Sequence, residues 1–398
     1  MATVTQPNPQ MAASDTPPIA QVSEKENSLS QRLAAVDLLR GFAMLLMALD
    51  HWAAYARINL NAEGYGGVRP ALGNPLEILI GLVTNLSSGI FFALAGTSIA
   101  FFEKSRRKRG WSEWEISRFL LIRAAILLIF DQIINVIGWS IRDAILFEVL
   151  SAIAFSMIVL AVIRLLPLRV IAVVGVGLFI GYPLLVALFP HNPDQPLSII
   201  TTILFQNYRE GLIQVETPLL GRLSLMLGGY VLGRLLSDRT VRISPRWLWI
   251  AGAGLAAWLV LRLGLLQGYG DFLPYTPGSP WIDLLIDSKH PPSLTFLLFN
   301  MSLSLVLLVL LDSFSSRLQG TRVSWVLTVL GQTSLFFFVA HMLFFKLVQL
   351  IFRGQPFIPV GDPILQLFLE TTVLLIVLVP LCAVYRNLRR QYPILSYL

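Results

Sequence analysis

The sequence has little charge and almost no cysteine. Only 13% of its 398 residues are charged, and its one cysteine, Cys382, lies in an apolar run. A single cysteine excludes a disulfide within the chain and a cysteine-based metal site. A metal site built from the four histidines is not expected either, because no pair of them has the helical spacing of metal ligands. We therefore expect no bound metal.

Motifs of soluble enzymes are missing as well. There is no glycine-rich phosphate loop, no Ser-His-Asp order and no redox cysteine pair. Instead, 55% of the residues are hydrophobic and the mean hydropathy is +0.70. Few soluble domains have this composition, whereas polytopic membrane proteins do. The net charge of +7 does not indicate nucleic-acid binding, because the basic residues gather in short loops between apolar runs.

Ten apolar stretches are each long enough to cross a bilayer as a helix. We predict them near residues 33–56, 76–102, 117–138, 143–166, 170–189, 216–236, 246–266, 293–313, 324–351 and 364–386. The predicted fold class is therefore all-α, a polytopic membrane protein with about ten transmembrane helices.

The remaining segments are short. Residues 1–31 are rich in Ser, Gln and Pro and contain no apolar run of a signal peptide, so we expect a disordered cytoplasmic tail. Residues 32–390 are predicted to form one membrane domain, and 391–398 a cytoplasmic C-terminal tail.

Basic residues predict the orientation in the membrane. Every even-numbered stretch is followed by a basic loop, and these loops begin near Lys104, Arg164, Arg234, Arg317 and Arg386. Since basic loops stay in the cytoplasm, these five loops and both termini are expected there. The opposite loops are longer and less basic, and we expect them to cap a cavity on the outer face.

The first predicted span carries four ionisable residues, Asp37, Arg40, Asp50 and His51. Each is costly in hydrocarbon, so each suggests a functional site. Eleven residues separate Arg40 from His51, which on a helix is about 1,100° of rotation and about 16 Å of rise. The two side chains therefore share a face at two depths, and Asp37 lies about 60° from Arg40. This spacing predicts a polar track that ends in an imidazole.

His51 and Arg40 each have two interpretations. His51 either acts as a general base toward an acceptor amine or hydroxyl, or caps the outer end of its helix. As a base, its ring would be oriented by Asp37 or by a residue from another helix. Arg40 either contacts a phosphate or carboxylate, or forms a buried ion pair with Asp37. The shared face of the three residues favours the functional interpretation of His51, while the two interpretations of Arg40 both stay open.

Asn85 and Ser88 are further candidates for substrate contacts. Both fall in the outer half of the second span, near the depth of His51, and Asp50 lies at the same end of the first span. We expect these three residues to line a cavity. The alternative for Asn85 and Ser88 is close helix packing in a stretch rich in small residues.

Two other groups have weaker predictions. The basic residues Arg106, Arg107 and Lys108 are expected to orient the protein and touch anionic lipid, with a donor phosphate as the less favoured partner. His341 lies in an apolar run, where a buried histidine with satisfied hydrogen bonds is the default.

Several of these motifs resemble a known family. The segment from Arg32 to Phe42, followed by Asp50 and His51, resembles the start of the heparan-α-glucosaminide N-acetyltransferase-like bacterial membrane proteins. These belong to the transmembrane acyltransferase superfamily, whose mark is an Arg, ten residues and then a His. Weaker similarities lie at 91–98, 106–110, 290–293, 330–341 and 380–386.

The resemblance implies an enzyme of the bacterial inner (plasma) membrane. Such an enzyme takes an acyl group, expected to be acetyl, from cytoplasmic acyl-CoA and passes it to a sugar or other envelope acceptor outside. It implies His51 as the base, Asp37 and Arg40 as the pathway or donor contact, and His341 as a second site histidine. The animal lysosomal enzymes use a histidine in the loop after the first span, and residues 57–75 contain none. The role therefore falls to His51, and the choice between N- and O-acylation stays open.

The expected partners are the bilayer, acyl-CoA as co-substrate and the acceptor, without a bound cofactor or nucleic acid. A homodimer is left open. The alternative function is a transporter or flippase of an anionic envelope precursor, with Arg40 as the counter-charge. A purely structural membrane protein would leave the four ionisable groups of the first span unexplained.

Overall fold

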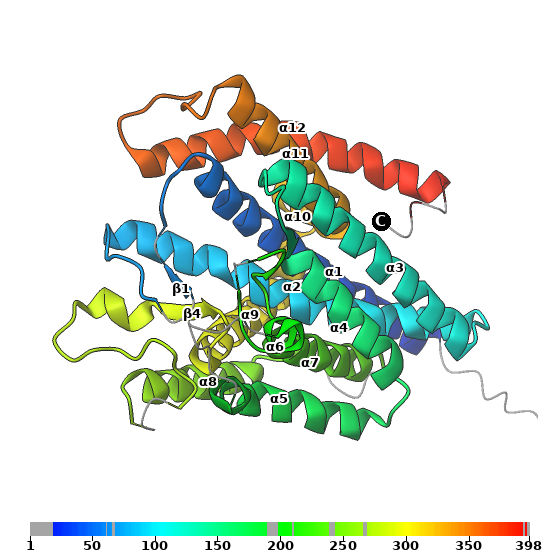
Figure 1. Ribbon diagram of the computed structural model, residues 1–398. Helices are drawn as coiled ribbons and strands as arrows, with labels where there is room; N and C mark the ends of the chain where they lie inside the picture. Colours follow the sequence, from blue (N-terminus) through cyan, green and yellow to red (C-terminus); the bar gives the residue numbers. More distant parts are fainter. Residues whose placement is uncertain are drawn as a thin grey trace, which may run out of the picture.

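The computed structural model describes residues 19–60, 62–65, 68–188, 198–208, 211–238, 243–265, 269–392 and 395. Helices dominate these residues (Figure 1). In chain order the helices are α1 (Ile19–Tyr55), α2 (Pro75–Lys108), α3 (Glu113–Ile133), α4 (Val149–Ile163), α5 (Leu168–Leu188), α6 (Ile199–Leu204), α7 (Leu219–Ser237), α8 (Trp247–Arg262), α9 (Leu294–Leu318), α10 (Arg322–Gln332), α11 (Ser334–Ile351) and α12 (Pro363–Gln391). A π-helical turn, Ile134–Gly138, extends α3, and a 3₁₀ turn covers Trp281–Leu285.

The predicted all-α membrane architecture is confirmed. Among the described residues, seven helices are long and apolar enough to cross a membrane: α2, α3 with its π turn, α5, α7, α9, α11 and α12. The helices α4 and α8 are apolar but shorter, and α1 carries the four ionisable residues of the first span. Each of the ten predicted stretches contains a helix, although the fourth, 143–166, begins with a short strand, Ile145–Phe147.

The ninth stretch differs from its prediction, because it is two helices instead of one. The chain breaks at Thr333, between α10 and α11. Two carbonyl groups at the break are satisfied from other helices: Arg40 Nη1 donates to Gly331 at 3.2 Å and Arg389 Nη1 donates to Gln332 at 3.1 Å. Inside a membrane such freed carbonyls need protein donors, and these distant arginines supply them.

The first helix is longer than predicted. α1 begins at Ile19, inside the segment expected to be a disordered tail, and residues 1–18 lie outside the described residues. The predicted domain boundaries and the cytoplasmic location of the tails stay predictions.

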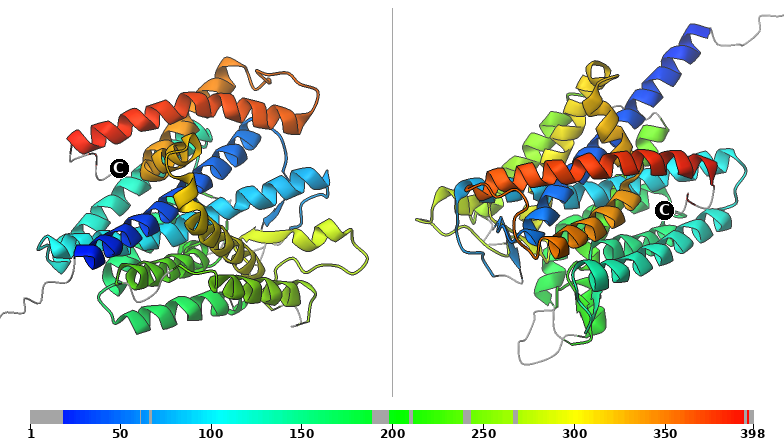
Figure 2. Two further views of the ribbon diagram at one scale, coloured as in Figure 1. Left: turned by 180° about the vertical axis from the view of Figure 1, so that it is seen from behind. Right: turned by 90° about the horizontal axis from the view of Figure 1, so that it is seen from above.

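Helices α1 and α2 lie in the middle of the bundle. In Figure 1 and in the left view of Figure 2, α11 and α12 lie along one edge and α5 and α8 along the opposite edge. The approach of α10 to α1 requires glycine on both helices. A Cβ atom on Gly41 would overlap the carbonyl oxygen of Leu327, and one on Gly331 would overlap that of Asp37. This close packing brings the Thr333 break beside Arg40.

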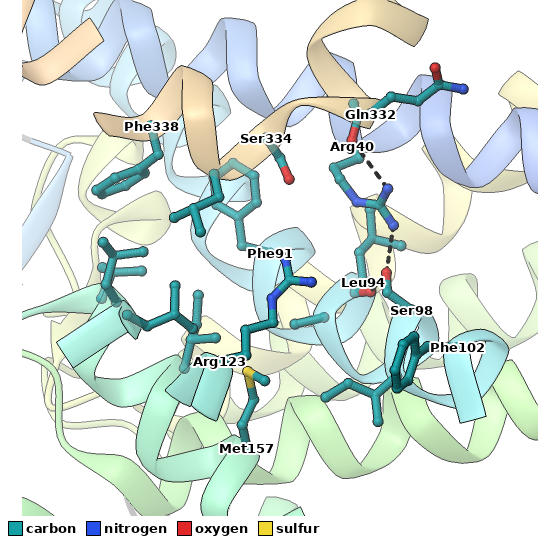
Figure 3. Close-up of a pocket in the computed structure, with 18 of the residues that line it drawn as sticks. Arg40, Phe91, Leu94, Ser98, Phe102, Arg123, Met157, Gln332, Ser334 and Phe338 are labelled. Atoms are coloured by element: carbon teal, nitrogen blue, oxygen red, sulfur yellow. Dashed lines mark hydrogen bonds between the residues drawn. The ribbon is translucent and has the colours of Figure 1, made fainter. Parts of the chain in front are cut away.

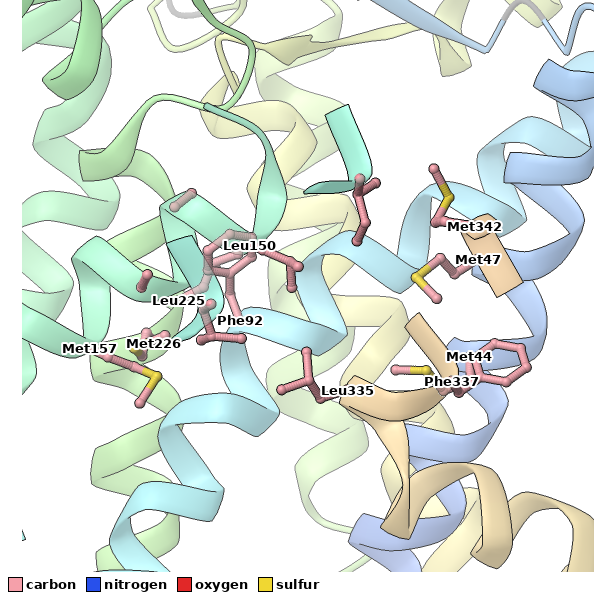
Figure 4. Close-up of a cluster of buried hydrophobic side chains, with 14 of the residues drawn as sticks. Met44, Met47, Phe92, Leu150, Met157, Leu225, Met226, Leu335, Phe337 and Met342 are labelled. Atoms are coloured by element: carbon pink, nitrogen blue, oxygen red, sulfur yellow. The ribbon is translucent and has the colours of Figure 1, made fainter. Parts of the chain in front are cut away.

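The core is rich in methionine. Met44 and Met47 of α1, Met157 of α4, Met226 of α7 and Met342 of α11 are all buried (Figure 4). Unbranched methionine fills irregular gaps between helices that cross at different angles.

In the described part of the chain, four short strands lie among the helices. β1 (Glu63–Tyr65) pairs in parallel with β4 (Asp287–His290), and β2 (Ile145–Phe147) pairs in parallel with β3 (Ile213–Val215). All four belong to connecting segments near the end of α1 that carries His51. They bring residues from four separate loops around that histidine.

Candidate functional site

Two cavities lie along α1. The first, here called the arginine cavity, has a volume of about 320 Å³ and is lined by Arg40, Arg123 and Arg389 together with Ser98 and apolar side chains. The second, the histidine cavity, has a volume of about 780 Å³. Its polar lining comprises Asp50, His51, Asn59, Glu63, Asn85, Glu148, Gln214, Glu216, Lys289 and His290, with Trp139 beside them.

Arg40 is held in place by its neighbours. Its Nη1 donates to Asp37 Oδ1 at 2.9 Å and to the Gly331 carbonyl, and its Nη2 donates to Ser98 Oγ at 2.6 Å. The ion pair with Asp37 is thus present, as the second interpretation of Arg40 predicted. Asp37 also accepts from Gln332 Nε2 at 3.2 Å. Arg40 therefore ties α1 to α2 and α10, and it still lines the arginine cavity (Figure 3).

Arg123 is the guanidinium that this network does not use. It enters the arginine cavity from α3, opposite Arg40 (Figure 3). Its side chain forms no hydrogen bond or ion pair with any other described residue. A charge inside a membrane is normally paired or functional. Arg123 is therefore the residue best suited to contact an anionic ligand in this cavity.

The basic cluster after α2 is mostly engaged within the protein. Arg107 pairs with Glu103 at 2.5 Å and with Glu113 at 2.8 Å, while Lys108 is exposed. Arg106 stacks over the ring of Phe102 at 5.1 Å, and Phe102 lines the arginine cavity. Of the three, Arg106 is thus the one nearest to that cavity's wall.

His51 pairs with the other histidine that sequence motifs singled out. His51 Nδ1 and His341 Nε2 are 2.8 Å apart, although 290 residues separate them in the chain. His341 Nδ1 lies 2.9 Å from the Phe337 carbonyl oxygen, which can only accept, so this nitrogen carries a hydrogen. In the neutral pair, His341 Nε2 then accepts and His51 Nδ1 donates. This assignment leaves His51 Nε2 unprotonated, without a partner among the described residues.

The ring of His51 is thus oriented by a residue from another helix, the second of the two expected arrangements. Asp37 does not reach it, because the two residues are fourteen positions apart on α1, about 21 Å of helix rise, and Asp37 is bonded to Arg40 and Gln332. Trp139 and Phe338 stand edge-on to the His51 ring, with centroids 5.9 and 6.0 Å away. His341 is fully buried and lines neither cavity, so in this structure it contacts His51 and not the lining of a ligand site.

The predicted substrate contacts divide into two groups. Asp50 and Asn85 do line the histidine cavity, with Asp50 accepting from Thr84 Oγ1 at 2.8 Å. Ser88 does not line it, because its hydroxyl accepts from the buried Arg222 at 2.9 Å. Its expected place on the cavity wall is therefore wrong, and it belongs to the packing between α2 and α7.

Lys289 is a site residue that sequence motifs did not indicate. Its Nζ lies 2.6 Å from Glu63 Oε2 and donates to Asn85 Oδ1 at 3.0 Å. Burial lowers the pKa of this amine, but the charges of Glu63 and Asp50 more than offset the burial, and the pKa is raised above its usual value. Lys289 is therefore a permanent positive charge in the wall of the histidine cavity.

A thin partition separates the two cavities. Val149 lines both of them, and Phe338 lines the arginine cavity while its ring faces His51. Along α1, the rise from Arg40 to His51 is about 16 Å. His51 thus stands where a group extended from the arginine cavity would meet a molecule in the histidine cavity.

Two of the missed residues had a visible signal. Arg123 interrupts an apolar run of α3, and the rule that identified Arg40 applies to it equally. Glu148 falls within the predicted span 143–166, so the same rule applies to it. Lys289 lies in a connecting segment, where a charged residue is ordinary, and no feature of the sequence distinguishes it.

Comparison with known proteins identifies the family. No curated protein matches the chain. Residues 33–386, which include every residue lining the two cavities except Arg389, match the family model described as an acyltransferase domain. The chain therefore belongs to this family of acyltransferases, and its apolar helices make it a multi-pass membrane member.

Proposed function

We propose that this acyltransferase moves an acyl group, expected to be acetyl, from acyl-CoA in the arginine cavity to an acceptor in the histidine cavity. The observation that carries the proposal is the position of His51. Its Nε2 is unprotonated in the neutral pair with His341, and the ring lies at the partition between the two cavities. A base is thereby available where donor and acceptor would meet.

The arginine cavity suits the phosphate-bearing part of acyl-CoA. Arg40, Arg123 and Arg389 line it, and guanidinium groups bind phosphate oxygens through paired donors. The pantetheine arm is about as long as four or five extended residues, roughly 14–18 Å. With the phosphate at the arginines, the thioester would come close to His51, about 16 Å away along α1.

The reaction is a transfer between two nucleophiles. The acceptor oxygen or nitrogen attacks the thioester carbon while His51 Nε2 takes its proton, and a tetrahedral intermediate forms. The carbon–sulfur bond then breaks, the acyl group stays on the acceptor, and the proton passes from His51 to the departing sulfur. Neutral His341 holds the His51 ring by accepting a hydrogen bond from His51 Nδ1. It stabilises the protonated His51 less than a carboxylate would, so protonated His51 gives its proton to the departing sulfur more readily.

We further propose that the arginine cavity opens to the cytoplasm and the histidine cavity to the outside, in a bacterial plasma membrane. The five basic loops support this orientation, because Phe102 and Arg389 of the arginine cavity lie beside two of them. A transporter of an anionic precursor fits less well, since it would give the paired His51 and His341 at the partition no role.

Arg123→Gln tests the donor site. We expect this substitution to weaken acyl-CoA binding by roughly 10- to 100-fold, because a hydrogen bond to a charged group contributes about 1.5–3 kcal/mol. Equilibrium binding of acetyl-CoA to the purified protein measures the effect.

Arg118→Gln is the matched control for Arg123→Gln. Arg118 is exposed on the same helix and lines neither cavity, so this variant undergoes the same charge change away from the site. Its affinity should stay close to that of the unmodified protein. Equal affinities of the two variants would mean that Arg123 does not contact the donor.

A further inference from the structure

The two cavities have opposite charge. Four carboxylates and one ammonium group line the histidine cavity: Asp50, Glu63, Glu148, Glu216 and Lys289. With neutral histidines, four negative charges and one positive charge leave a net charge of −3. The arginine cavity is lined by three guanidinium groups and no carboxylate, and Asp37, bonded to Arg40, offsets one of them. Its net charge is then +2.

The negative sign persists when Arg222, a charge behind the wall, is included. The guanidinium of Arg222 does not line the histidine cavity, but it donates to the Lys289 carbonyl at 3.2 Å. Adding it leaves four negative and two positive charges, a net charge of −2. A cavity with one sign of charge and low-dielectric walls concentrates its field on whatever enters.

The single ammonium group of the wall is already engaged. Lys289 is bonded to Glu63 and Asn85, so an entering anion would have to compete with a carboxylate at 2.6 Å for the same amine. An entering amine or hydroxyl meets carboxylate and amide oxygens as acceptors. The electrostatics therefore discriminate against a carboxylate or phosphate on the acceptor.

The rest of the lining suits a molecule with many hydroxyl groups. Asn59, Asn85 and Gln214 provide amides that both donate and accept, and Trp139 provides an aromatic surface. The volume of about 780 Å³ is that of a small-molecule site.

We infer that the histidine cavity selects its acceptor by charge: it favours a neutral or amine-bearing acceptor and rejects one that carries a negative charge at the reacting unit. This inference rests on the proposed function, because it takes the histidine cavity as the acceptor site. It names Lys289 and the cavity carboxylates as the residues that set the charge preference.

Glucose, glucosamine and glucuronic acid provide the test. Glucose is neutral, glucosamine carries one ammonium group, and glucuronic acid carries one carboxylate. Their binding to the purified full chain is measured near pH 7 by ligand-observed NMR, without acyl donor and with His51→Ala to prevent any turnover. We expect glucosamine to bind at least about tenfold more tightly than glucuronic acid, with glucose between them, since one charge is attracted and the other repelled. Equal or tighter binding of glucuronic acid, or no binding of any of the three, overturns the inference.

Opposite charge changes in the wall sharpen this test. Glu148→Gln should lower the preference for glucosamine over glucuronic acid by roughly threefold, and Lys289→Gln should raise it by a similar factor. Asp143→Asn is the matched control, because Asp143 is exposed and lines neither cavity. Its preference should not change, and equal changes in all three variants would also overturn the inference.

The binding test and the acyl-transfer test fail independently. A lack of charge preference would leave transfer by His51 intact, because neutral and acidic acceptors would then both serve. A protein that prefers glucosamine but never consumes acyl-CoA would keep the charge preference and lose the proposed donor.

Discussion

His51→Ala is expected to lower the rate of acyl transfer by roughly 10²–10⁴-fold, the usual effect of losing a general base. The reason is that His51 Nε2 has no other described partner and lies at the partition between the two cavities. Consumption of acetyl-CoA by the purified protein in the presence of an amine or hydroxyl acceptor measures the effect.

His51→Gln separates chemistry from positioning. A glutamine at position 51 of α1 can still donate a hydrogen bond to His341 of α11. Its amide, however, cannot take up a proton at neutral pH. We expect His51→Gln to be about as inactive as His51→Ala while its melting temperature stays near that of the unmodified protein. Near-normal turnover in either variant would mean that His51 only packs against Trp139 and Phe338.

Glu103→Leu is expected to lower the free energy of unfolding by about 3–5 kcal/mol, as does removing one member of a buried ion pair. Glu103 is almost fully buried and is contacted by Arg107 at 2.5 Å, Arg164 at 3.4 Å and Arg234 at 3.6 Å. Tyr230 also donates to it at 2.5 Å. Without this carboxylate, the buried Arg164 loses a partner that links α2, α4 and α7. Denaturant titration in detergent measures the loss.

Glu113→Gln is the matched control for Glu103→Leu. Glu113 binds two of the same arginines, Arg107 at 2.8 Å and Arg164 at 2.5 Å, but it is 47% exposed. Water screens a pair at such a position, so its loss should lower the free energy of unfolding by about 1 kcal/mol or less. Equal losses in the two variants would show that burial of Glu103 adds nothing to the stability of this end of the bundle.

The helices were predictable because each signal is local. Length and hydropathy of a stretch decide whether it can cross a membrane, and all ten predicted stretches contain a helix. The break at Thr333 was not predictable, because the run from 324 to 351 is apolar throughout. What makes the break tolerable is the pair of donors Arg40 and Arg389, which come from other helices.

The site was predictable where its geometry follows from a single helix. The ion pair of Arg40 with Asp37 follows from the helical repeat, and so does the depth of His51 along α1. The pairing of His51 with His341 depends on how α11 packs against α1, which no local pattern encodes. Ser88 illustrates the same limit, because its helical position fixed its depth but not the neighbour it faces, Arg222.

The most direct test of transfer across the partition uses sealed vesicles that contain the purified protein. Acetyl-CoA labelled in its acetyl group is supplied on one side of the membrane, and glucosamine is present only on the other. We predict labelled N- or O-acetyl sugar in the compartment opposite the donor, and none with His51→Ala. Label that stays on the donor side, or the same trans-membrane transfer with His51→Ala, would contradict a reaction at His51 between the two cavities.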